Sequence, residues 1–302
     1  MAINRAQLAK ELEPGLNALF GMEYARYDNE HAEIFDTESS DRAFEEEVML
    51  SGFAQAQVKP EGSGVTFDNA QETYTARYSH ETVALAFSIT EEAIEDNLYD
   101  QLSSRYTKAL ARSMANTKQV KAVSPLINGL PSGSFTSGDG VSLFNTAHPT
   151  IAGNVKNTLS TAADLNETSL EQSLIDIAAL TDERGLKIAA RGVKMIIPSE
   201  LQFTAERLMK SAGRVGTEDN DVNAIASMGM IPQGYRVNNF LTDTDAFYII
   251  TDVPNGMKYF ERSPIKTAME GDFDTGNVRY KARERYSFGV SDFRGIFGVE
   301  GA

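Results

Sequence analysis

The longest uninterrupted helical pattern in the chain runs from residue 88 to residue 123. Its apolar side chains recur every four residues and form one slowly drifting stripe, at Ile94, Leu98, Leu102, Tyr106, Leu110 and Met114. Ser88 and Glu91 have the spacing of a capping box, which predicts a helix start there, and no glycine or proline follows before Pro125. At about 1.5 Å per residue this helix would be on the order of 50 Å long. Such a length favours a spine along an elongated subunit over the alternative, a long core helix of an enzyme domain.

The composition is that of a folded protein with one large or two medium domains. The chain has 302 residues, of which 41% are hydrophobic and 24% are charged. It contains no cysteine, which excludes disulfides, cysteine nucleophiles and thiolate metal sites. No apolar run has the length of a membrane span, and the N-terminus lacks the apolar core of a signal peptide. The net charge of −15 argues against a protein whose main function is to bind nucleic acid.

The first 50 residues are acidic but also carry many apolar side chains. Two short amphipathic pieces, Ile3–Leu12 and Leu16–Tyr24, are expected on either side of Pro14-Gly15. From Glu11 to Glu47 there are twelve acidic and two basic residues, which a solvated face would explain. The apolar content favours instead an arm that buries these side chains against neighbouring subunits. They are Leu16, Leu19, Phe20, Tyr24, Tyr27, Ile34, Phe35 and Phe44.

Residues 50–87 have the pattern of a long two-stranded hairpin. Turn-forming residues at 58–64, rich in glycine, separate two stretches with strand-like alternation. A hairpin of this length is marginally stable alone and requires a surface on which to lie.

The second half of the chain predicts a compact α+β arrangement. Helices are expected to be capped at Thr168 and Ser199, and strands are expected at 193–197, 235–237, 246–252, 259–262, 277–290 and 295–299. The elements do not alternate regularly as in βαβ folds, and no internal repeat is present.

No motif in the sequence predicts catalysis, a metal site or a cofactor. The histidines His31, His80 and His148 have no metal-binding spacing, and His148 is expected to be a loop histidine bonded to the backbone. Phosphate-binding loops and nucleophile elbows are absent from the sequence. Loop pairs at Asp243/Asp245 and Asp272/Asp274 leave a weak cation site open, without the spacing of an EF-hand. Carboxylates brought together only by folding would leave an acidic hydrolase possible.

Basic residues gather near the C-terminus. On the predicted strand 277–290, four of them share one face: Arg279, Lys281, Arg283 and Arg285. This is typical of the solvent-exposed face of an edge strand, and DNA binding is a further, less favoured alternative. Because opposite charge lies at the two ends of the sequence, we expect this face to pair with the acidic arm of a neighbouring chain.

Four stretches cover most of residues 138–298: GDGVSLFNTAHPT, KMIIPSELQFTAERLMKS, YIITDVPNGMKYFERSP and KARERYSFGVSDFRGIFG. They resemble the Mu-like head-subunit branch of the major capsid proteins of tailed bacteriophages, which have the Hong Kong 97-type fold. The resemblance implies five segments. They are an N-terminal arm at 1–48, an E-loop at 49–87, a peripheral domain with the spine helix at 88–157, an axial domain at 158–257 and the C-terminal strands of the peripheral domain at 258–302.

The resemblance also implies a function and partners. Such subunits are not enzymes, need no cofactor, and form the hexamers and pentamers of an icosahedral shell around double-stranded DNA. We expect synthesis in the cytoplasm of a host bacterium and residence in the virion, without membrane contact. Because the chain begins at Met1 with arm-like sequence, we expect a separate scaffolding protein, together with a portal and a possible cement protein.

Some members of this fold form Lys–Asn crosslinks, for which Lys59 at the hairpin tip would be the donor; a solvated turn lysine is the simpler interpretation. An encapsulin-like compartment that encloses enzymes is the nearest alternative function. A monomeric binding module would expose too much apolar surface.

Overall fold

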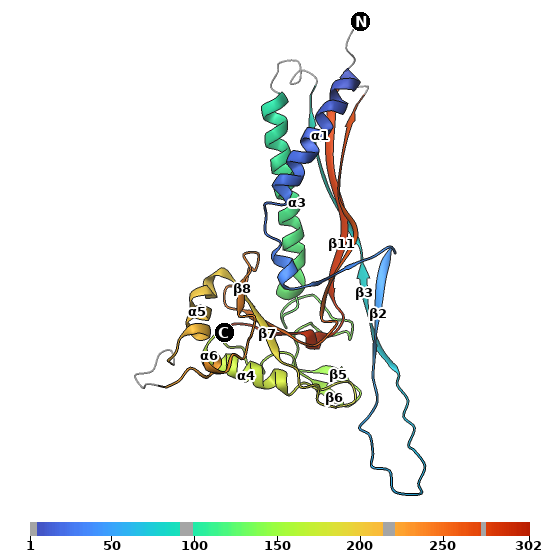
Figure 1. The fold of residues 1–302 in the computed structure, drawn as a ribbon, viewed down its shortest axis with the longest axis vertical. Helices are drawn as coiled ribbons and strands as arrows, with labels where there is room; N and C mark the ends of the chain where they lie inside the picture. Colours follow the sequence, from blue (N-terminus) through green and yellow to red (C-terminus); the bar gives the residue numbers. More distant parts are fainter. Residues whose placement is uncertain (1–4, 91–98, 214–220, 273–275) are drawn as a thin grey trace.

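The computed structural model describes residues 5–90, 99–213, 221–272 and 276–302 of an elongated molecule. Two long helices and long strands occupy one end, a smaller α/β part occupies the other, and a hairpin projects away from both (Figure 1). The mixture of helices and strands agrees with the predicted α+β class. Within the described ranges, no helix combines the length and the apolar character needed to cross a membrane.

The predicted long helix is α3, which spans Tyr99–Ile127 and has 29 residues. The predicted start at Ser88 is wrong, because Ser88 lies in strand β4 (Glu81–Ile89) opposite Arg279. The alternating side chains of β4 join a sheet, and this long-range pairing overrides the local capping signal. Glu91, Ile94 and Leu98 lie outside the described residues. Of the predicted stripe, Leu110 and Met114 are buried, whereas Tyr106 is 49% exposed.

The N-terminal arm contains one helix, α1 (Arg5–Tyr24), where the sequence predicted two pieces. Pro14 lies inside this helix, although a proline in a helix interior costs about 3 kcal/mol. Burial of Leu16 and Phe20 against α3 and the long strands offsets that cost. The arm therefore buries Leu16, Phe20, Ile34 and Phe35 within its own subunit, which corrects the expectation that these four need a neighbour for burial, whereas Phe44 stays exposed.

A four-stranded sheet with the order β1-β10-β11-β4 lies beside α3. Strand β1 (Asp36–Ser39) pairs in parallel with β10 (Met257–Gly271), which pairs antiparallel with β11 (Val278–Val290). Tyr280 and Ala282 of β11 are buried against α1 and α3. Because β4 covers its other side, β11 is an internal strand and not the edge strand considered from the sequence.

The smaller part is built on a second sheet with the order β12-β9-β7-β8. Its strands are β7 (Gly192–Ile197), β8 (Tyr235–Val237), β9 (Phe247–Thr251) and β12 (Ile296–Val299). Helices α4 (Glu167–Ala178), α5 (Gln202–Lys210) and α6 (Ala224–Met228) accompany it. Asn166, not Thr168, caps α4, in a capping box with Ser169. A short ladder, β5 (His148–Thr150) and β6 (Gly153–Val155), and 3-10 turns η1 (Glu30–Glu33), η2 (Ser199–Leu201) and η3 (Phe293–Gly295) complete the fold.

The hairpin pairs at a different place from the one predicted. Its strands are β2 (Phe44–Leu50) and β3 (Glu72–Ser79), and residues 51–71 form a long loop without regular strands. The second predicted strand is in fact divided at His80, because β4 leaves the hairpin and joins β11. The paired strands thus form the stem, and the glycine-containing segment forms a loop that projects from the body (Figure 1).

Candidate functional site

The hairpin loop carries apolar side chains that the subunit leaves in solvent. Phe67 is 93% exposed and Val58 is 94% exposed, Phe53 and Val65 are each at least 60% exposed, and Leu50 at the end of β2 is 61% exposed. Single exposed apolar residues are ordinary, but several on one projecting segment mark an interaction surface. Lys59 is also exposed on this loop. Phe44, at the start of the stem, is 39% exposed and lies under the guanidinium of Arg77 at 4.1 Å.

A buried ion cluster fixes the stem of the hairpin to the long strands. The ammonium of Lys258, on β10, lies 2.9 Å from Glu38 and also pairs with Glu47 of β2. Burial alone would lower the pKa of Lys258, but its bonds to the two carboxylates outweigh this and raise the pKa. Glu47 and the Tyr78 hydroxyl both bond to the hydroxyl of Ser291. The stem is therefore held at a defined angle, whereas the loop beyond it has few contacts.

The basic face predicted on β11 exists. Arg279, Lys281 and Arg283 are exposed, Arg285 is partly exposed, and the residues between them are largely buried. Lys266 of β10 lies opposite Arg283, and the small residues Ala84 and Ala86 of β4 flank the row on its other side. We call Lys266, Arg279, Lys281, Arg283 and Arg285 the cation ladder. Arg279 pairs with Asp272 in its own loop.

Much of the acidic arm is already paired within its own subunit. Glu33 bonds to Lys194 at 2.6 Å, and Glu38 bonds to Lys258. Both bonds reduce the free negative charge that the arm could offer to the cation ladder of a neighbour. The predicted pairing of arm and ladder between chains remains a prediction.

Three aromatic residues assigned to intersubunit contacts have partners in their own chain. Phe20 and Phe35 are buried, with 2% and 4% of their surfaces exposed. The hydroxyl of Tyr24 donates to Glu284 at 3.2 Å. Packing inside the subunit is sufficient to explain the apolar character of Phe20 and Phe35.

Sequence reasoning missed a buried charge pair beneath these aromatic residues. Glu284 is only 1% exposed and lies 3.6 Å from the ammonium of Lys118 on α3. Burial raises the pKa of the Glu284 carboxyl above its ordinary value, and burial likewise raises the pKa of the Tyr24 hydroxyl. The available signal was a glutamate among the apolar positions of a strand, which predicts a buried partner without identifying it.

His148 was expected to bond to the backbone, and this is wrong. Its ring is buried and lies between two side chains, with Nδ1 2.5 Å from Asp139 and Nε2 3.0 Å from Asn157. The ring also stacks on Phe293 at 3.8 Å. Asn157 donates in turn to the carbonyls of Leu143 and Phe293. The cluster joins three loops and serves to hold them together.

The basic residues near the C-terminus do not all face solvent. Arg294 is 2% exposed and bonds to Glu183 at 2.7 Å and to the carbonyl of Thr181. Asp243 and Asp245 share a hydrogen bond that raises the pKa of Asp245, whereas Asp274 lies outside the described residues. Within the part of the chain that the structure describes, no three His, Cys, Asp or Glu side chains gather in a way that could hold a metal ion.

Three solved structures illustrate what this fold is similar to. The capsid of an empty GTA particle has a TM-score of 0.56 at 16% identity, covering 90% of this chain and 89% of that one. The virus-like particle from Pyrococcus furiosus has a TM-score of 0.55 at 9% identity, covering 95% and 98%. The capsid of Myoviridae phage XM1 has a TM-score of 0.53 at 11% identity, covering 89% of each chain. A search of curated protein sequences gives no significant match.

These likenesses define the class: the chain has the α+β fold of Hong Kong 97-type capsid proteins, as the sequence resemblance implied. Residues 73–299 match a protein family described as phage capsid protein. Since this match spans well over half of the chain, the protein belongs to the phage capsid protein family.

Proposed function

We propose that this protein is the major capsid subunit of a tailed bacteriophage, assembling into the hexamers and pentamers of an icosahedral shell around double-stranded DNA. The family match over residues 73–299 carries this conclusion. The Mu-like branch is the finer assignment, supported by the four quoted stretches between residues 138 and 298. The five segments 1–48, 49–87, 88–157, 158–257 and 258–302 are the proposed division into arm, E-loop, peripheral and axial parts.

The exposed hairpin loop is the proposed contact between subunits. Its apolar side chains, Phe67 above all, have no burial in their own subunit and gain it when the loop lies on a neighbour. Lys59 is exposed on the same loop, and Phe44 is a separate exposed position at the start of the stem that we also propose as a contact. The cation ladder is a second proposed contact, for a negatively charged surface of another copy.

Further partners follow from this function. We include a separate scaffolding protein, a portal and a possible cement protein, with synthesis in the host cytoplasm and residence in the virion. If Lys59 formed a crosslink, the particle protein would run above monomer size on a denaturing gel.

The test is assembly of the purified full-length protein, followed by light scattering and negative-stain electron microscopy. Closed shells, or rings of five and six that close when scaffold is added, are the expected result. Phe67→Ser should abolish assembly and leave the fold of the subunit intact, whereas Phe67→Leu, which keeps an apolar side chain, should still assemble. A wild-type protein that stays monomeric or dimeric under all these conditions would refute the capsid function.

The material enclosed by the shells distinguishes a phage head from an encapsulin-like compartment. Double-stranded DNA in particles from infected or induced cells supports the phage head. Protein cargo in its place would favour an encapsulin-like compartment.

A further inference from the structure

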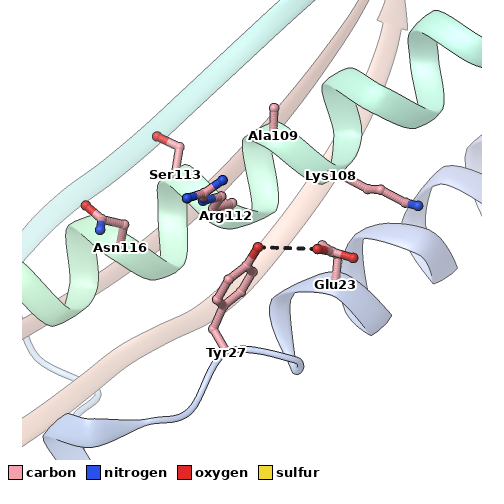
Figure 2. Close-up of a pocket in the computed structure, with 7 residues that line it drawn as sticks. All are labelled: Glu23, Tyr27, Lys108, Ala109, Arg112, Ser113 and Asn116. Carbon is pink, nitrogen blue, oxygen red and sulfur yellow. Dashed lines mark hydrogen bonds between the residues drawn. The ribbon is translucent and has the colours of Figure 1, made fainter. Parts of the chain in front are cut away.

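A groove of about 510 Å³ lies between α1 and α3. Glu23 and Tyr27 line it from the arm, and five residues line it from α3: Lys108, Ala109, Arg112, Ser113 and Asn116. Figure 2 shows the Tyr27 ring pointing from the arm toward α3, with its hydroxyl bonded to Glu23 of α1. The groove lies on the side of α3 that the sheet does not cover.

Among the described residues, the cations of this groove form no ion pair, although the Glu23 carboxylate lies in the same lining and pairs with Arg26. Arg105, Lys108 and Arg112 are exposed and recur at intervals of three and four residues, so they share one face of α3. No carboxylate in the described part of the chain forms an ion pair with any of the three. Further along the same helix, Lys118 and Lys121 are paired, with Glu284 and Glu81. In a chain of net charge −15, this stripe, like most of the cation ladder, carries positive charge without an ion pair in the described ranges, and an anionic partner would neutralise it.

The other side chains that line the groove indicate the chemical class of that anion. Ser113, Asn116 and Tyr27 add hydroxyl and amide donors to the two charges, and arginine, lysine, serine, asparagine and tyrosine are the side chains that contact phosphate oxygens. Tyr27 currently donates to Glu23 at 3.3 Å, and Glu23 also lies 3.7 Å from Arg26. Apolar anchors of the kind that dominate protein–protein interfaces are nearly absent, since Ala109 and the Tyr27 ring are the apolar lining.

We propose that this groove and the stripe beside it bind the phosphate backbone of double-stranded nucleic acid. The inference rests on the proposed capsid function and adds the surface of the subunit that meets the packaged DNA. We expect the contact to be independent of base sequence, because ionic contacts to phosphate oxygens carry no sequence information. The cation ladder lies on the face of the sheet that points away from α1 and α3, because the alternate residues Tyr280 and Ala282 pack against those helices.

The test uses full-length subunits before assembly, because a closed shell would hide an inner surface. Fluorescence anisotropy measures their binding to a labelled DNA duplex of about 20 base pairs at salt concentrations from about 50 to 200 mM. The variant is Lys108→Gln/Arg112→Gln, and the matched control is Lys281→Gln/Arg283→Gln, which removes the same charge from the cation ladder. Far-UV circular dichroism checks that both double variants keep the wild-type fold.

We expect the groove variant to bind every duplex more weakly. The plot of the logarithm of its DNA association constant against the logarithm of the salt concentration should be less steep by about 1.8, since each lost phosphate contact accounts for about 0.9. The control should retain the wild-type slope. The proposal would be overturned if both variants lost the same amount of DNA affinity, if only the control lost affinity, or if the wild-type protein bound no DNA. Polyglutamate of matched charge binding as tightly as DNA would overturn it as well, in favour of an acidic protein. Shells that still form when DNA binding fails would refute this inference alone and leave the capsid function standing.

Discussion

Replacing His31 with phenylalanine should reduce the acid sensitivity of the folded subunit. The His31 ring is 5% exposed, and its Nδ1 atom has no hydrogen-bond partner among the described residues. It lies edge-on to Tyr259 at 5.4 Å and to Phe288 at 5.7 Å, a geometry that a phenylalanine ring can also adopt. Burial, together with the smaller effect of the nearby charge of Lys118, lowers the pKa of His31 from 6.5 to about 4.

The direction of the pH effect on stability follows from comparing the protonation of His31 in the folded and the unfolded chain. Above about pH 6.5 the imidazole is neutral in both the folded and the unfolded chain, and its full contribution to stability is present. As the pH falls from about 6.5 toward 4, the unfolded chain binds a proton that the folded chain does not, and stability is lost. The fall in pKa corresponds to about 3 kcal/mol, which the solvent that still reaches the site reduces to about 2 kcal/mol.

The assay is urea unfolding of the unassembled subunit at about pH 7 and pH 5. Wild-type protein should lose about 1–2 kcal/mol more than His31→Phe between these values. Glu284, whose carboxyl pKa is raised, gains stability on acidification in both proteins and is removed by the comparison. His31→Gln should flatten the pH dependence in the same way, because it also cannot be protonated. Equal losses in wild type and both variants would refute the reasoning.

Three further changes test the packing of the fold by urea unfolding. Glu183→Ala leaves Arg294 buried without its main carboxylate and should cost about 3–5 kcal/mol; a loss under 1 kcal/mol would mean that Arg294 finds another partner. Gly298→Ala would place a methyl group 2.5 Å from the Phe144 ring and should cost about 1–3 kcal/mol, whereas an unchanged midpoint would show that the ring can move. Burial alone would raise the pKa of Asp139, but the hydrogen bond with His148 outweighs this and holds the pKa below 3.8, so stability present at neutral pH is lost below about pH 4. Asp139→Asn should remove that acid-induced loss, and an identical acid profile would contradict it.

Alternation along the chain predicted where several strands of the second half lie, but not which strands of residues 44–89 pair. The basic and apolar faces of β11 follow from a period of two residues, whereas the buried strand β7 was predicted from a short apolar run that ends at Pro198. Sequence signals for the start and the end of helices were less reliable. Ser88 forms no cap because β4 pairs with β11, and Pro14 breaks no helix because α1 is packed on α3.

The sequence by itself determined the α+β class, the long helix, the basic face of β11 and the resemblance to phage capsid proteins, because these depend on periodicity and on local motifs. Only the tertiary structure decided which polar side chains are buried together. Glu284 with Lys118, Arg294 with Glu183 and His148 with Asp139 all join residues from different elements or loops. It also decided that Phe20 and Phe35 pack inside the subunit while Phe67 stays exposed. Burial and pairing depend on contacts between distant parts of the chain, which a pattern of neighbouring residues does not contain.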